Sequence, residues 1–263
     1  MLKLFYSPGA CSLVTHIALE ESGADYEAVR VTLAKGEHHR PEYLEINPHA
    51  RVPALATAHA VVTENIAILN LIADLFEAPG SVPRDDPIEA ARCNTLLGWF
   101  ASSVHIAFAQ IWRGERFTED ADLHEAIKAG GLKALEKHFV EIEQRSGEGW
   151  LVAGQFTAAD SYALTFFRWG RRVGMDMGGY PRWSALLERV LVLAIVEDAT
   201  HRRYRVGCDL HKVEPLLLGQ RQGFACWQDA ELLTLIIDDP HLADADHVVD
   251  SEILGYECCS FNK

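Results

Sequence analysis

The stretch that decides the fold is LKLFYSPGACSLVTHIALEE, residues 2–21. Residues 2–6 are predicted to form a short strand, and the following Pro8 and Gly9 mark a turn. From position 11 to about position 22, apolar side chains recur at helical spacing, which predicts an amphipathic helix. The chain therefore starts with a strand, a tight turn and a helix.

Cys11 and Ser12 fall at the N-terminus of that helix. Free N–H groups and the positive end of the helix dipole favour an anion at such a place. A thiol placed there is expected to have a lowered pKa and to be partly a thiolate at neutral pH. A free cysteine at a strand–helix junction is just as typical of a small core residue, so the motif alone leaves both interpretations open.

The length and composition of the chain limit which class of protein it can be. The 263 residues suffice for two domains, and 49 % apolar with 24 % charged residues is typical of a soluble globular protein. The net charge is −14, and residues 204–263 alone carry 11 acidic and 4 basic residues. This balance argues against nucleic acid and anionic membranes as partners. We find no apolar run of spanning length and no secretory signal, so we expect a cytoplasmic protein.

The six cysteines have neither the spacing of a disulfide framework nor that of a zinc site. They are expected to be free thiols, and no metal site is predicted.

The first eighty residues predict the order β-α-β-α-β-β-α. After the opening strand and helix, the predicted elements are a strand over 26–33, a short helix over 41–46, strands starting at 52 and at 61, and a helix over 66–76. Beyond residue 87 the periodicity is helical, with helices near 88–112, 121–146, 158–174 and 181–200. The predicted domains are an α/β domain over 1–78, a linker over 79–87, an all-α domain over 88–203 and an acidic extension over 204–263.

Two further motifs each allow a structural and a functional interpretation. Val52-Pro53 opens a strand, where a proline belongs at a strand edge or start. If its peptide bond were cis, the Val52 backbone could pair with an extended peptide ligand. Glu64 and Asn65 begin a helix, where Asn65 could simply cap the helix or where the helix N-terminus could bind a carboxylate.

Together these pieces resemble the thioredoxin-like domain of a glutathione transferase, and the opening is similar to that of the bacterial beta class. The matching segments are YSPGACSL at 6–13, HIALEE at 16–21, EINP at 45–48, VPAL at 52–55, SSVH at 102–105 and FTAAD at 156–160. The resemblance covers about residues 1–200. It implies a thioredoxin-like N-terminal domain, an all-α C-terminal domain and a homodimer.

The resemblance also implies a role for each matching residue. Cys11 would lie beside the sulfur of glutathione, with which it can form a mixed disulfide in this class, and the Ser12 hydroxyl would point at the same sulfur. The Val52 backbone, with Pro53 cis, would pair with the cysteinyl moiety. The remaining roles are Lys35 at the glycyl carboxylate, Glu64 and Asn65 at the γ-glutamyl end, and His105 across the cleft near the sulfur or the second substrate.

The chain departs from the beta class around His105. The class usually has Asn, an acid and Lys where this chain has Gly98, Ser103 and Ile106. An acid at position 103 could bind the γ-glutamyl amine from the neighbouring subunit. Its loss removes a charge-assisted bond worth about 1.5–3 kcal/mol, so we expect glutathione affinity to be lower by about tenfold or more.

The expected activity is conjugation of glutathione, as co-substrate, to a small electrophile that the sequence does not identify. Two alternatives stay open: a glutathione-dependent thiol oxidoreductase or peroxidase acting through Cys11, and a non-enzymatic binding protein built on the transferase fold. Thr157 and Asp160 have the spacing of a capping box, and we expect their role to be structural.

Overall fold

The computed structural model describes residues 1–76, 80–147, 149–152 and 154–200, with side chains described up to residue 190. The predicted extension over 204–263 lies outside the described residues, as does the predicted boundary between residues 78 and 79. Within the described residues, no helix is both long enough and apolar enough to cross a membrane.

The N-terminal domain is a four-stranded mixed sheet with helices. Its elements are β1 (Leu2–Tyr6), α1 (Ser12–Glu21), β2 (Tyr26–Arg30), the 3-10 turns η1 (Leu33–Lys35) and η2 (Glu37–His39), α2 (Pro41–Leu44), β3 (Ala54–Ala56), β4 (Val61–Thr63) and α3 (Asn65–Leu75). This order confirms the predicted β-α-β-α-β-β-α. The second strand ends earlier than predicted, at Arg30, because the chain turns into η1, and the third starts at Ala54 rather than at Val52.

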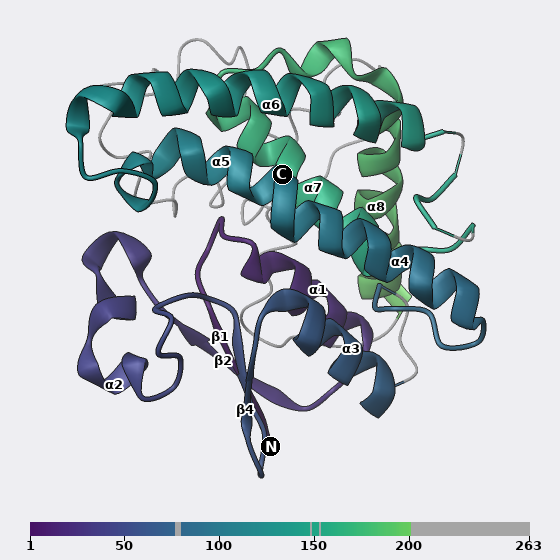
Figure 1. The fold of residues 1–263 in the computed structure, drawn as a ribbon. Helices are drawn as coiled ribbons and strands as arrows, with labels where there is room; N and C mark the ends of the chain where they lie inside the picture. Colours follow the sequence, from purple (N-terminus) through teal and green to yellow (C-terminus); the bar gives the residue numbers. More distant parts are fainter. Residues whose placement is uncertain (77–79, 148, 153, 201–263) are drawn as a thin grey trace, which may run out of the picture.

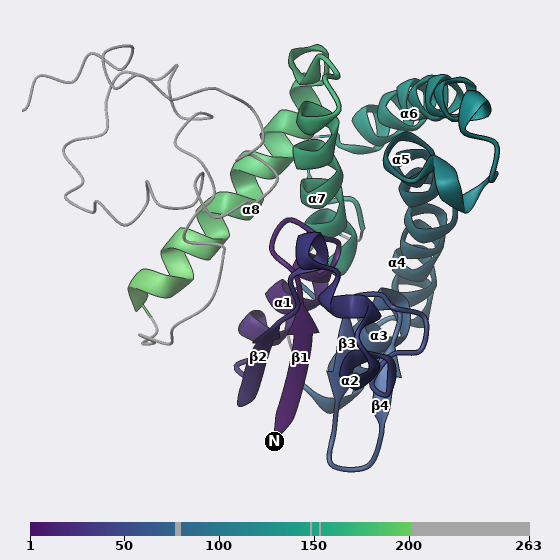
Figure 2. The ribbon, with the colours of Figure 1, turned by 90° about the vertical axis from the view of Figure 1, so that its left-hand side faces the viewer.

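The strand order is β2-β1-β3-β4, with β1 parallel to β2 and antiparallel to β3. Successive side chains of β1 point to opposite faces of the sheet. Leu4 is fully buried in the main core, whereas Phe5 packs with Tyr43 of α2 at a ring distance of 6.0 Å. The segment over 33–47, which contains η1, η2 and α2 and is called the α2 lobe here, therefore covers one face of the sheet. Helix α1 lies on the other face, between the sheet and α7 (Figure 2).

The second domain is helical in the part of the chain that the structure describes. Its elements are α4 (Pro87–Trp99), the π-helical turn η3 (Phe100–Val104), α5 (His105–Trp112), the 3-10 turns η4 (Gly114–Arg116) and η5 (Ala121–Leu123), α6 (His124–Arg145), α7 (Ala158–Arg172), the 3-10 turn η6 (Met177–Gly179) and α8 (Pro181–Thr200). Two of these helices begin at capping residues that can be recognised in the sequence. Asp86 caps α4 with Pro87 at its first position, and Thr157 and Asp160 form the predicted capping box of α7.

The helices α5 and α6 run side by side in Figure 1 and approach closely. Gly131 of α6 makes this possible, since a Cβ at that position would lie 2.7 Å from the carbonyl oxygen of Ala107. The single helix predicted over 88–112 is divided by the π-helical turn η3, whose extra residue rotates the side chains that follow. His105, the first residue of α5, is the first side chain after that turn.

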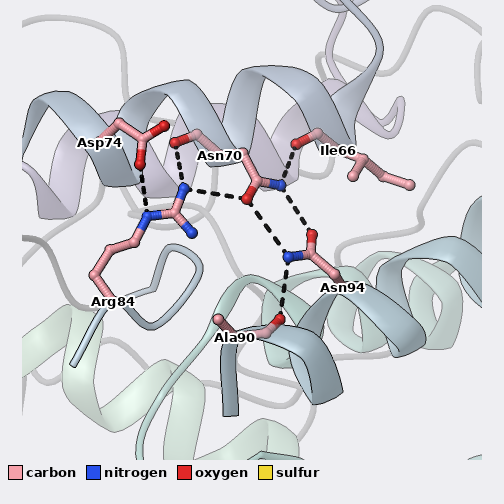
Figure 3. A network of polar contacts seen from close by, with 6 residues as sticks. All are labelled: Ile66, Asn70, Asp74, Arg84, Ala90 and Asn94. Carbon is pink, nitrogen blue, oxygen red and sulfur yellow. Dashed lines mark hydrogen bonds and ion pairs between the residues drawn. The ribbon is translucent and has the colours of Figure 1, made fainter. Parts of the chain in front are cut away.

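One apolar core joins the two domains, because α1 packs against α7 and buried residues of both domains form one cluster. A polar network also links α3 to the second domain (Figure 3). The amide of Asn70 donates to the Asn94 side chain at 2.8 Å, and Arg84 donates to the Asn70 carbonyl at 2.8 Å. Arg84 also forms an ion pair with Asp74 at 2.7 Å.

Candidate active site

Cys11 is the N-cap residue of α1 and lies at the end of the loop from β1. Its side chain is buried, with 9 % of the residue exposed, and its thiol donates to the carbonyl oxygen of Val52 at 3.6 Å. This contact joins the start of α1 to the segment that precedes β3. It brings together two of the residues that the sequence analysis singled out.

The pKa of Cys11 is shifted in the opposite direction from the one expected, since it is raised and not lowered. Burial raises it to about 12 and is the largest effect, with a smaller contribution in the same direction from the charge of Glu64. The backbone N–H, the side chain of Asn65 and the charge of Arg51 all lower the pKa, but they do not compensate. The expectation of a lowered pKa was wrong because it counted the helix N-terminus and omitted the cost of burying a thiolate.

Ser12 lies next to Cys11 and is fully buried. Its hydroxyl accepts a hydrogen bond from the backbone N–H of Ser7 at 3.1 Å and donates to the Ser7 carbonyl at 3.2 Å. These bonds close the loop between β1 and α1. In this structure the hydroxyl hydrogen is therefore directed to Ser7.

The peptide bond between Val52 and Pro53 is cis, as the resemblance implied. The carbonyl of the preceding Arg51 accepts hydrogen bonds from the Tyr43 hydroxyl at 2.6 Å and from the Asn47 amide at 2.7 Å. The α2 lobe thus fixes the backbone on which Val52 presents its carbonyl to the Cys11 thiol.

Glu64 and Asn65 begin α3 in a different way from the predicted cap. Glu64 is the N-cap residue, with φ of 68° and ψ of 126°, and no side-chain cap is formed. A residue other than glycine in this region costs about 1–3 kcal/mol, and such positions are concentrated at functional sites. Asn65 donates instead to the Cys11 carbonyl at 3.1 Å and accepts from the Thr15 hydroxyl at 2.6 Å, so it holds α3 against α1.

His105 faces the same region from the second domain. Its Nδ1 lies 3.4 Å from the Tyr162 hydroxyl, and its ring lies 5.1 Å from that of Trp169. Burial, together with the charges of Arg116 and Arg51, lowers the pKa of His105 to about 4. The imidazole is therefore neutral at pH 7.

Two residues of α7 complete the site, and neither was predicted from the sequence. The Trp169 ring N–H donates to the Gly9 carbonyl at 2.7 Å, which fixes the loop before Cys11. Tyr162 is deeply buried, and this burial and the charge of Cys11 raise its pKa, whereas a hydrogen bond with Asn65 lowers it. Its hydroxyl also contacts His105. Their seven-residue separation puts them on one helix face, which was the signal in the sequence that could have found them.

The structure brings Cys11, Ser12, Val52, Asn65 and His105 together, whereas it shows no interaction of Lys35 with any of these residues. Lys35 is exposed at the end of η1, and its charge acts on the carboxylate of Glu37. Among the described residues, no group of three or more His, Cys, Asp or Glu side chains could hold a metal ion.

Comparisons with known proteins identify the family to which the chain belongs. Residues 1–74 match the family "Glutathione S-transferase, N-terminal domain", and residues 103–193 match "Glutathione S-transferase, C-terminal domain". The chain therefore belongs to the glutathione S-transferase family. Its fold is accordingly the thioredoxin-like plus all-α fold expected from the sequence.

Individual relatives extend over most of the described chain. Glutathione S-transferase GstA of Escherichia coli O157:H7 is 33 % identical over 201 residues, which are 75 % of this chain and 96 % of that protein. A crystal structure of a glutathione transferase homologue from Sulfitobacter with bound glutathione has a TM-score of 0.69 at 30 % identity, covering 76 % of this chain and 98 % of that one. The bacterial beta-class glutathione S-transferase of Sphingomonas chungbukensis has a TM-score of 0.59 at 32 % identity, covering 72 % and 92 %.

Proposed function

We propose that this protein is a glutathione transferase that joins the sulfur of glutathione to an electrophilic carbon of a small molecule. One observation carries the proposal: the loop before α1, the Val52 carbonyl and the start of α3 meet around the buried Cys11, and Tyr162 links His105 of the second domain to them. The similar Sulfitobacter structure contains glutathione, which supports glutathione as the co-substrate.

In this proposal each part of glutathione has its own protein group. The Val52 backbone pairs with the cysteinyl moiety beside Pro53, and Lys35 attracts the glycyl carboxylate. Glu64 and Asn65 hold the γ-glutamyl end, where the free N–H groups at the start of α3 favour its carboxylate. His105 faces the sulfur and the second substrate as a neutral hydrogen-bonding group.

Cys11 and Ser12 act on the sulfur of glutathione once their hydrogens turn to it from the carbonyls of Val52 and Ser7, which accept them in the free protein. Because burial keeps Cys11 protonated at neutral pH, its S–H is a hydrogen-bond donor and not a nucleophile in the free protein. A donor aimed at sulfur stabilises the thiolate form of glutathione. The glutathione sulfur then forms a bond to carbon, the leaving group departs with its electron pair, and the thiol proton is released to solvent.

The raised pKa of Cys11 favours conjugation over the thiol oxidoreductase alternative, since thiol exchange requires a thiolate. We further propose that the protein is a cytoplasmic beta-class homodimer. The similar beta-class structure supports the class. The exposed Ile106, beside His105 on α5, is the kind of apolar side chain that a second subunit would cover. Light scattering in solution, with twice the chain mass expected, tests the dimer.

The first experiment is a thermal melt with and without reduced glutathione, followed by a conjugation assay with 1-chloro-2,4-dinitrobenzene. Glutathione at about 100 times Kd should stabilise the fold by about 2.7 kcal/mol, which raises Tm by several degrees. The Cys11→Ala variant should conjugate more slowly at pH 6.5 and recover towards pH 9, because the bound thiol has lost a donor. The matched control is Cys93→Ala, which removes a buried thiol of α4 outside the site.

Unchanged pH profiles in Cys11→Ala would contradict the role of Cys11. No shift in Tm at millimolar glutathione would contradict the proposed function and leave the interpretation as a binding protein. Turnover of glutathione mixed disulfides without thioether formation would instead identify an oxidoreductase.

A further inference from the structure

Three arginines from the two domains lie next to the proposed glutathione site. Arg51 immediately precedes Val52, whereas Arg113 follows the end of α5 and Arg116 lies in η4. All three are exposed, and no ion pair involves them in the ranges that the structure describes. Figure 1 shows the loop after α5, which contains Arg113 and η4, above the α2 lobe, so this loop lies on the side of the second domain that faces the first.

These charges are close enough to act on one another and on the site. The charge of Arg51 acts to lower the pKa of Cys11 and that of His105, and burial, followed by the charges of Arg51 and Arg113, lowers the pKa of Arg116. Arg113 also acts on His38 of the α2 lobe. Among the described residues, the one acid whose charge raises the pKa of Arg116 is its neighbour Glu115, and its effect is smaller than that of either arginine. In a chain of net charge −14, this is a local excess of positive charge.

An aromatic cluster borders the arginines. It consists of Phe108, Trp112 and Trp169, with Trp112 5.2 Å from each of the other two rings. Trp112 is 39 % exposed and directly precedes Arg113, and Trp169 lies against His105. Apolar and cationic surface therefore adjoin on the second-domain side of the site.

Such an arrangement suits a ligand with two properties. A planar ring packs on exposed aromatic surface, and an anionic substituent relieves the repulsion among guanidinium groups while accepting their hydrogen bonds. We infer that the second substrate is an aromatic electrophile carrying a carboxylate or a similar anionic group, which Arg51, Arg113 and Arg116 bind beside the aromatic cluster. The inference rests on the proposed function, because it names the substrate class of that same site.

The test uses two electrophiles that differ only in charge, 4-chloro-3,5-dinitrobenzoate and 4-chloro-3,5-dinitrobenzamide. With each, the glutathione sulfur bonds to the ring carbon, chloride leaves with the bonding electron pair, and the thiol proton goes to solvent. Calorimetry with the two preformed glutathione conjugates measures recognition without requiring turnover, and kcat/KM for the two electrophiles measures it during conjugation.

We expect the carboxylate conjugate to bind about tenfold more tightly than the carboxamide, as for one charge-assisted contact. Arg51→Gln and Arg116→Gln should each reduce this preference to within about twofold, and added salt should weaken it. The control is Arg182→Gln, which removes an exposed arginine at the start of α8 and should retain the preference.

Equal affinity for the two conjugates, or rejection of both by protein that binds glutathione, would overturn the inference and leave glutathione binding intact. If the arginine variants bound free glutathione more weakly but kept the preference for the carboxylate conjugate, the arginines would bind a carboxylate of glutathione instead. This result would also overturn the inference. Absence of glutathione binding in the thermal melt would remove the proposed function itself.

Discussion

Two opposing electrostatic effects act on Cys11. The start of α1, the Asn65 amide and the charge of Arg51 favour the thiolate, whereas burial and the charge of Glu64 favour the thiol. Burial is the largest effect, so the pKa rises to about 12 and the side chain is a neutral donor to Val52. A helix N-terminus activates a cysteine only where water or a ligand charge remains close to the sulfur.

This balance predicts how Cys11 of the free protein reacts with iodoacetamide. Only the thiolate reacts, and its fraction rises about tenfold per pH unit as long as the pH stays well below the pKa. The alkylation rate of Cys11 should therefore increase steadily from pH 7 to pH 9 without reaching a plateau. Mass spectrometry of the peptide that contains Cys11 separates its alkylation from that of the other cysteines.

Two variants test the cause of the shift in opposite directions. Glu64→Gln removes a negative charge that raises the pKa of Cys11, so alkylation should become faster. Arg51→Gln removes a positive charge that lowers this pKa, so alkylation should become slower. A plateau below pH 8, or the same response in both variants, would show that burial does not control this thiol.

At the scale of elements, the capping box of α7 fixes the helix that carries Tyr162 and Trp169. The carboxylate of Asp160 accepts hydrogen bonds from the Thr157 backbone at 2.8 Å, the Thr157 hydroxyl at 2.9 Å and the Leu151 backbone at 2.9 Å. Asp160 is nevertheless fully buried, and burial raises its pKa to about 6. The box therefore holds the start of α7 and the preceding loop in one position.

Replacing Asp160 with alanine should lower the free energy of unfolding by at least about 1 kcal/mol, because buried N–H groups lose their acceptor. A folded-state pKa of about 6, above the ordinary value of 3.8, means that the native carboxyl holds its proton more tightly than the unfolded one. Its contribution to stability is therefore complete below pH 3.8 and is lost as the pH rises through 6. The difference in Tm between wild type and Asp160→Ala should accordingly be larger at pH 5 than at pH 7, with unchanged glutathione affinity.

The control for Asp160→Ala is Asp176→Ala. Asp176 also accepts a backbone hydrogen bond at a helix start, from Gly178 at 3.0 Å, but it is exposed. This variant should lose much less stability and show no comparable pH dependence. Equal losses in the two variants, or a fall in glutathione affinity in Asp160→Ala alone, would contradict a purely structural role for the capping box.

The elements that could be predicted from the sequence are those defined by local signals. The capping box predicted the start of α7, and apolar periodicity predicted the bounds of α6 and α8 to within a few residues. The π-helical turn before His105 has no local signal, since its helical periodicity continues on both sides. The sequence left Asn65 open as a helix cap or as part of a carboxylate site, and it could not predict the partners of Asn65, because Cys11 and Thr15 lie fifty or more residues away.

The same distinction applies to the site. The candidate residues of the first domain could be predicted because their short motifs resemble a known family, whereas Tyr162 and Trp169 were missed. Those two act through contacts with His105 and Gly9, which only the packing of α7 against the first domain creates. Burial of Cys11 is likewise a property of the packed molecule, and this is why its pKa could not be inferred from its position in the chain.

At the scale of the whole molecule, the two domains share one core. Val14 and Ile17 of α1 are buried in the same cluster as Phe166 of α7 and Trp183 of α8. Two polar contacts reinforce this packing across the boundary, from Trp169 to Gly9 and from Asn70 to Asn94 (Figure 3). Neither domain can lose its structure without exposing apolar surface of the other, so the stability of each depends on both.

We therefore expect the two domains to unfold in a single transition. Ile17→Ala in the first domain should cost about 2–5 kcal/mol, as is usual for a buried isoleucine. Five tryptophans, at 99, 112, 150, 169 and 183, lie in the second domain, so their fluorescence reports mainly on that domain. The fluorescence midpoint in urea should fall together with the far-ultraviolet circular dichroism midpoint, and Leu135→Ala in α6 should give the same coincidence. A fluorescence transition that Ile17→Ala leaves in place would show that the domains unfold separately and that the shared core does not couple them.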